Sequence, residues 1–239
     1  MRPTPAGERL AEHAARILLR VDVARSELAH LAQAPVELRV GVCPLAVPGL
    51  VAAALRELRV EQPTVRVTIR SIDASSAVAE VAAGTLDVAL VDGITAPDNP
   101  LALADAGLLA SSALVEAPLV VALPVGHPLA RRTSIDLDVL ADAPWVITPG
   151  LPGSGAPVPG ATGSVVYDGN DLPTLLGLVA GGHGSALLPT SACAGAPGIV
   201  AVPLGRPTLV HRTEVLALRG ATGATRRMIG ALRARGSIT

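Results

Sequence analysis

The sequence has almost no aromatic residues, no lysine and only two cysteines. Its 239 residues include one Trp, one Tyr and no Phe, so Ala, Val and Leu must fill the core. The shortage of rings argues against a surface that stacks single-stranded nucleic acid bases. All 19 strongly basic residues are Arg, and the formal net charge is −1. The chain therefore has no overall basic field that would favour DNA.

Several patterns that indicate metal binding, catalysis or export are also missing. Cys43 and Cys193 lie too far apart in sequence to suggest a disulfide framework or a zinc site. The sequence contains no HExxH, no close His/Cys cluster and no G-x-S-x-G turn, so we expect no metal, no cofactor and no α/β-hydrolase chemistry. The first residues contain no apolar export signal, and no unbroken apolar run reaches about 18 residues. We therefore expect a cytoplasmic protein without a membrane span.

The first 35 residues are predicted to form a linker and dimerisation helix. Thr4 and Pro5 suit a helix start, and Pro35 disfavours helix in the residue before it. Between them apolar residues are spaced alternately four and three apart, as in helices that pair along their length. The predicted seam consists of Leu10, Ala14, Ile17, Val21, Ala24, Leu28 and Leu31. The alternative is an amphipathic helix that lies on its own domain.

From residue 36 onward, strand and helix patterns alternate. Strands are expected at 38–42, 65–69, 86–91, 119–123, 145–147, 165–167, 185–188, 199–202 and 214–218, and helices at 47–61, 74–83, 135–140, 171–180 and 225–235. This alternation predicts an α/β fold with a parallel sheet and right-handed crossovers. Residues 149–163 are rich in Gly and Pro and are expected to form a loop.

Several stretches together resemble the LysR-type transcriptional regulators. None is specific alone, but they follow the order expected for that family over nearly the whole chain. The stretches are TPAGE at 4–8, LRVG at 38–41, QPTV at 62–65, GTLDVAL at 84–90, HPLA at 127–130, and LVAGGHG at 178–184 running into ALLP at 186–189.

The resemblance implies two Rossmann-like lobes of the type 2 periplasmic-binding-protein kind, preceded by the linker helix. Lobe I would comprise residues 36–118 and 204–239, and lobe II residues 119–203. Strands near Leu119–Leu123 and Ile199–Val202 would cross between the lobes, and a small effector would bind between them. The protein would form dimers or tetramers.

This chain departs from the family pattern in two places. The family carries a winged helix-turn-helix before the linker helix, and at most its last residues could be present at Met1–Pro3. DNA would therefore be bound only through an N-terminal domain that this chain lacks. The loop at 149–163 also replaces a helix that the family usually carries in lobe II, which alters that side of the pocket.

The predicted effector site lies beyond the carboxyl ends of the strands, where helix N-termini point free N–H groups at ligands. The candidate residues are Cys43, Leu45, Ala46, Ser75, Val91, Asp92, Thr148, Pro149 and Asp168. Family members often hold an effector carboxylate with a Ser or Thr after the first strand, but here that segment has no hydroxyl. Either the effector is more apolar, or Ser75 and Thr148 supply the polar contacts. Ser75 and Ser76 could instead be helix caps.

Cysteine, histidine and aspartate residues also have expected roles other than an effector contact. Cys43 could act as a redox sensor if the neighbouring helix lowered its pKa, and otherwise it is a small buried hydrophobe. His127 is expected to have a structural role in its turn, and His183 to be exposed in a loop. Asp87 is expected to hold backbone donors at the start of its strand.

These patterns leave three candidate functions. The first is the effector-sensing and oligomerising part of a LysR-type regulator, which binds a small metabolite between its lobes. The second is a solute-binding protein of a transporter on the same fold. The third is an enzyme that uses carboxylates such as Asp73, Asp92 and Asp171, although no nucleophile–base pair supports it.

Overall fold

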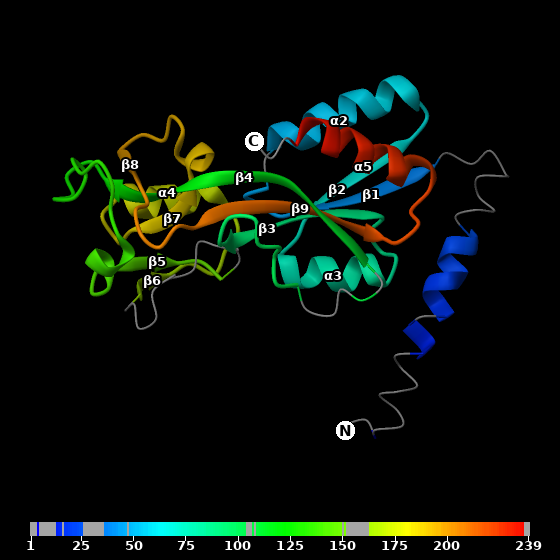
Figure 1. Ribbon diagram of the computed structural model, residues 1–239, viewed down its shortest axis with the longest axis horizontal. Coiled ribbons are helices and arrows are strands. Elements are labelled where there is room, and N and C mark those ends of the chain that lie inside the picture. The colour runs from blue at the N-terminus through cyan, green and yellow to red at the C-terminus, as the bar shows by residue number, and fades with distance from the viewer. Residues whose placement is uncertain are drawn as a thin grey trace.

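The fold is an α/β structure with one central mixed sheet (Figure 1). The computed structural model describes residues 4, 13–15, 17–25, 36–46, 48–103, 107, 109–149, 151 and 163–236. The elements are β1 (Glu37–Val42), α2 (Pro48–Glu61), β2 (Arg66–Ser71), α3 (Ala74–Ala82), β3 (Val88–Thr95), β4 (Leu109–Pro124), η1 (Leu137–Leu140), β5 (Trp145–Ile147), β6 (Gly163–Val166), α4 (Leu172–Ala180), β7 (Ala186–Pro189), η2 (Thr190–Cys193), β8 (Ile199–Pro203), β9 (Val210–Leu218) and α5 (Gly223–Arg235).

The strands follow the order β2-β1-β3-β9-β4-β7, and β8 pairs with β4 outside this path. Strand β1 pairs in parallel with β2 and β3. Every pairing of β4 and β9 is antiparallel. The predicted parallel pairing is therefore confirmed for β1 with β2 and β3, and for β5 with β6 in a separate two-stranded sheet. It is wrong for β4, β7, β8 and β9, because β9 returns from lobe II and inserts between β3 and β4 in the opposite direction.

Two long strands connect the lobes. Residues Leu109–Pro118 of β4 pair with β9 in lobe I, whereas Leu119–Pro124 pair with β7 and β8 in lobe II. The sequence predicted only the apolar end of β4. The crossing expected at Ile199–Val202 is wrong, because β8 pairs with the lobe II part of β4, and β9 is the strand that returns to lobe I.

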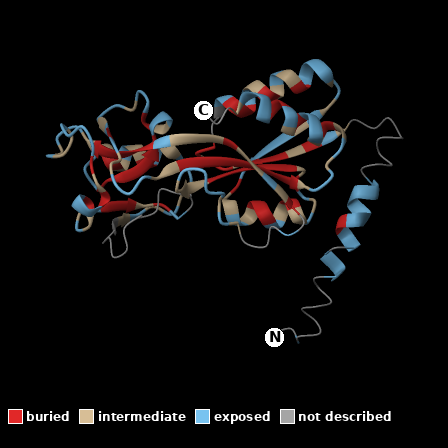
Figure 2. Ribbon diagram, viewed as in Figure 1, coloured by how far each residue is buried: buried red, intermediate tan, exposed pale blue. Residues whose placement is uncertain are grey.

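The buried apolar residues form three clusters, one in lobe I and two in lobe II. In lobe I, helices α2 and α5 cover one face of the sheet and α3 covers the other (Figure 1). Figure 2 shows that the strands at the centre of both lobes are buried. In lobe II the indole of Trp145 is fully buried and donates to the Leu140 carbonyl at 3.2 Å. These clusters hold rigid strands whose ends meet between the lobes.

Aspartate side chains cap the N-termini of two helices. Asp73 caps α3 by accepting from the Ser76 N–H at 2.8 Å, and Asp171 caps α4 by accepting from the Thr174 N–H at 2.8 Å. Gly84, with φ of +72°, follows the end of α3, where a left-handed residue closes the helix. Asp87 accepts from the Arg39 N–H at 2.7 Å, which confirms its structural role at the start of the strand.

The N-terminal segment is helical at residues 13–15 and 17–25. Leu19 is buried and lies next to Gly84 at the end of α3. The predicted seam residues Ala14, Ile17, Val21 and Ala24 are exposed, whereas Leu10, Leu28 and Leu31 lie outside the described residues. Pairing through the seam therefore remains a prediction.

The described part of the Gly/Pro-rich stretch includes a core side chain. Leu151 is fully buried in the lobe II cluster, which the composition of residues 149–163 did not suggest. Residues 150 and 152–162 lie outside the described residues. Among the described helices, none is both long and apolar enough to cross a membrane.

Candidate effector-binding cleft

The two lobes are in contact at the carboxyl ends of their strands. The Asn170 side-chain amide, just before α4 in lobe II, donates to Ser71 Oγ at the end of β2 in lobe I at 3.4 Å. Leu45, which follows β1, is buried in the lobe II cluster with Val146 and Leu175. Two of the segments expected to form the cleft, 71–76 and 168–171, are thus brought together.

The segment after β1 borders a pocket of about 340 Å³ between α2 and β2. Its wall is mainly apolar, and its polar side chains are Arg70 and Ser71. The lining residues are Val42, Cys43, Pro44, Ala46, Val51, Ala52, Leu55, Ile69, Arg70 and Ser71. The predicted site residues Cys43 and Ala46 line this pocket, and Ser71 lies both on its wall and at the contact between the lobes. Their contact with an effector stays a prediction.

The serines at the start of α3 are helix-capping partners. Ser75 Oγ donates to Asp73 Oδ1 at 2.5 Å, and Ser76 Oγ donates to Asp73 Oδ2 at 2.5 Å. These hydrogen bonds lower the pKa of Asp73 to about 2. The carboxylate thus occupies the helix N-terminus and engages both hydroxyls, so the capping alternative describes Ser75 better than the effector contact does.

A group of buried polar side chains lies where β3 meets β9. Asp92 is opposite Thr213, and Ile94 is opposite His211, so the three polar residues share one face of the sheet. His211 Nε2 lies 3.6 Å from Asp92 Oδ2, too far for a hydrogen bond. Both oxygens of Asp92, Nε2 of His211 and Oγ1 of Thr213 are buried without a hydrogen-bond partner.

The sequence identified Asp92 but not His211 or Thr213. Asp92 follows the third predicted strand directly, whereas the other two lie more than 100 residues later in the chain. Their proximity depends on the antiparallel return of β9. The signal in the sequence was a run of four polar residues, His211 to Glu214, before the apolar part of β9.

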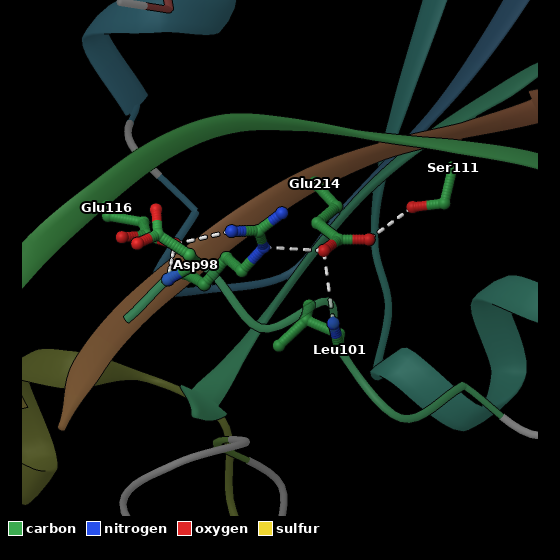
Figure 3. Close-up of polar contacts among 6 residues, drawn as sticks. Asp98, Leu101, Ser111, Glu116 and Glu214 are labelled. Carbon is green, nitrogen blue, oxygen red and sulfur yellow. Dashed lines mark hydrogen bonds and ion pairs between the residues drawn. The ribbon is translucent and has the colours of Figure 1, made fainter. Parts of the chain in front are cut away.

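A second polar network lies on β4 and β9 (Figure 3). Arg212 Nε donates to Glu214 at 2.6 Å, and its guanidinium also donates to Glu116. Glu214 accepts in addition from the Leu101 N–H at 3.0 Å and from Ser111 Oγ. Burial disfavours the charged guanidinium, but the hydrogen bonds to Glu214 and Glu116 outweigh this effect and raise the pKa of Arg212. The network fixes both crossing strands and the loop that contains Leu101.

The other predicted site residues are dispersed. Val91 alternates with Asp92 and so projects from the opposite face of β3, within the lobe I core. Thr148 is fully buried in lobe II, whereas Pro149 and Asp168 are exposed. Asp171 caps α4 and accepts from the Tyr167 hydroxyl. The carboxylates Asp73 and Asp171 that an enzyme could use thus have structural partners.

Both thiols are buried and free. Burial, followed by the charge of Asp92, raises the pKa of Cys43 to about 12, and burial raises the pKa of Cys193 to about 11. A redox sensor needs the opposite shift, so that hypothesis for Cys43 is wrong and the thiol is a small buried hydrophobe.

We therefore expect neither thiol to react with Ellman's reagent at pH 8 in the folded protein. With a pKa of about 12, only about one Cys43 thiol in ten thousand is ionised at that pH. The Cys43 thiol has a pKa near 8.5 in the unfolded chain and about 12 in the folded chain. The free energy of unfolding should therefore fall as the pH rises between these two values. Unfolded protein in guanidinium chloride is the control and should release two equivalents. Rapid reaction of folded Cys193→Ala protein would contradict the burial of Cys43.

The fold and the cleft define a two-lobed domain of the type 2 periplasmic-binding-protein kind, in which ligands bind between the lobes. Residues 32–237 match the family model described as "LysR substrate binding domain". The chain belongs to this family.

Comparisons with individual proteins agree with this assignment. The chain is 29% identical over 200 residues to the uncharacterized HTH-type transcriptional regulator YnfL of Escherichia coli, a match covering 79% of this chain and 64% of YnfL. It is 28% identical over 194 residues to the Hca operon transcriptional activator HcaR of E. coli, covering 78% and 62% of the two chains. The chain thus spans slightly less than two thirds of these regulators.

Solved structures show the same fold. The effector-binding domain of QuiR in complex with shikimate gives a TM-score of 0.68 at 13% identity, covering 84% of this chain and 96% of QuiR. A full-length OxyR variant from Pseudomonas aeruginosa gives a TM-score of 0.66 at 23% identity, covering 99% of this chain and 77% of the OxyR chain. The relatives are transcriptional regulators, which favours the regulator hypothesis over the transporter alternative.

Proposed function

We propose that this chain is the effector-sensing and oligomerising part of a LysR-family DNA-binding transcriptional regulator. A small metabolite binds between lobe I (36–118 and 204–239) and lobe II (119–203). The relatives YnfL and HcaR are named as transcriptional regulators, which supports a cytoplasmic regulator without catalytic activity. In this proposal the lobes sense the effector, and another part of the regulator contacts DNA.

The observation that supports the proposal best is the contact between the lobes. Asn170 reaches Ser71 through one exposed hydrogen bond, and Leu45 inserts from lobe I into the lobe II core. A ligand that binds one arrangement of the lobes better than another shifts the population between them. The same movement would change how a second copy of the chain is held.

The test is a thermal-shift screen of chemically diverse metabolites against the purified chain. We expect at least one compound to raise Tm in a concentration-dependent manner. Asn170→Ala removes the hydrogen bond between the lobes and should weaken binding of that compound by roughly two- to tenfold. Asn99→Ala, on an exposed loop of lobe I, is the matched control. If no compound stabilises the chain, the sensing function is refuted.

We also expect the N-terminal helix to pair with a second copy of the chain. Ile17 and Val21 are 64% and 44% exposed in the single chain, so pairing would remove apolar surface from water. Ile17→Asp with Val21→Asp should raise the dissociation constant at least about tenfold in sedimentation equilibrium. Leu18→Asp, equally exposed but outside the seam, is the control. A wild-type chain that is monomeric at micromolar concentration would contradict the pairing.

A further inference from the structure

The cluster formed by Asp92, His211 and Thr213 lacks the hydrogen bonds that buried polar groups normally have. The Asp92 side chain is fully buried and that of His211 is 2% exposed. Four polar atoms of the cluster have no hydrogen-bond partner: both carboxylate oxygens of Asp92, Nε2 of His211 and Oγ1 of Thr213. Leaving a buried polar atom unpaired is costly, so several unpaired atoms in one place suggest a site that a ligand completes.

The Asp92 cluster lies at the junction of the lobes. His211 is paired with Ala117 of β4, two residues before β4 changes its partner from β9 to β7. The Asp92 carboxylate and backbone are close enough to Cys43, which lines the pocket after β1, to influence the pKa of its thiol. The unpaired atoms therefore lie beside this pocket and near the junction of the lobes.

The polar groups here offer acceptors rather than positive charge. Asp92 presents two carboxylate oxygens, His211 presents its ring nitrogen Nε2, and Thr213 can accept at Oγ1. Asp73 and Asp171 already occupy the N-termini of α3 and α4, where an anion could otherwise bind. In the described part of the chain, no arginine forms an ion pair with Asp92.

We infer that the effector carries a protonated amine, which enters the Asp92 cluster and donates to Asp92, His211 and Thr213. An ammonium group has three N–H donors, one for each of these residues, and it also compensates the buried carboxylate. This inference rests on the proposed function, because it names the chemical class of the effector. An amine effector also accounts for the absence of a hydroxyl group in the segment after β1, where family members often hold an effector carboxylate with a Ser or Thr.

The test compares probes that differ only in one functional group. Benzylamine, benzyl alcohol and benzoate form one series, and 1,4-diaminobutane, 1,4-butanediol and succinate form another. In isothermal titration calorimetry the amine of at least one series should bind at least about tenfold more tightly than its alcohol or carboxylate. Asp92→Asn should abolish this preference, and Thr213→Val should weaken amine binding several-fold. Asp138→Asn, an exposed lobe II carboxylate, is the control.

A second measurement separates a binding role of Asp92 from a structural one. Because its buried carboxylate accepts no hydrogen bond, Asp92→Asn should leave Tm of the unliganded chain unchanged or raise it. A clear fall in Tm would make Asp92 structural and overturn the inference. Tightest binding by carboxylates or alcohols would also overturn it, but the proposed sensing function would stand. If neither the probes nor the metabolite screen give any binding, both proposals fail.

Discussion

Replacing Glu214 with Ala is expected to destabilise the folded chain by about 3–5 kcal/mol. The Glu214 side chain is 2% exposed and accepts from Arg212 Nε, the Leu101 N–H and Ser111 Oγ. The substitution leaves these donors unpaired and removes one of the two carboxylates that compensate Arg212. Because breaking a buried pair strands the remaining charge, the loss should be far larger than for a surface ion pair. Urea denaturation followed by circular dichroism measures it.

Glu61→Ala is the matched control for the Glu214 substitution. It also removes a glutamate that pairs with an arginine, Arg227, at 2.9 Å, but both side chains are about half exposed. Exposed pairs contribute up to about 1 kcal/mol. Equal losses for the two variants would show that the buried network contributes no more than a surface pair.

Replacing Trp145 with Ala is expected to cost about 3–5 kcal/mol, which is the range for removing a large aromatic side chain from a core. Trp145 is fully buried, belongs to a lobe II cluster with Leu140 and Leu187, and donates its indole N–H to the Leu140 carbonyl. Gly184 lies against its backbone, where an added Cβ would meet the Trp145 carbonyl carbon at 2.8 Å.

Thermal unfolding by circular dichroism tests the Trp145 substitution, with Tm expected to fall by roughly 10 °C. Trp145→Phe should retain part of the stability because most of the ring volume remains. Val139→Ala removes an exposed apolar side chain from η1 in the same lobe and should have little effect. A Trp145→Ala protein as stable as Val139→Ala would contradict the packing described for lobe II.

The local elements were largely predictable because their signals are contained in short segments. The helices predicted at 47–61 and 171–180 and the strand predicted at 145–147 agree closely with α2, α4 and β5. The first half of β4 was missed because polar and small residues interrupt its apolar pattern there. Its strand conformation depends on pairing with β9, which lies about 100 residues away.

The sequence by itself determined the α/β class, the positions of most helices and strands, and the likeness to LysR regulators. These features follow from hydrophobic periodicity, helix capping and short sequence motifs, each of which involves only a few neighbouring residues. Only the tertiary structure decided that β9 returns antiparallel beside β3. That pairing places His211 and Thr213 next to Asp92, because residues distant in the chain become neighbours only through the register of paired strands.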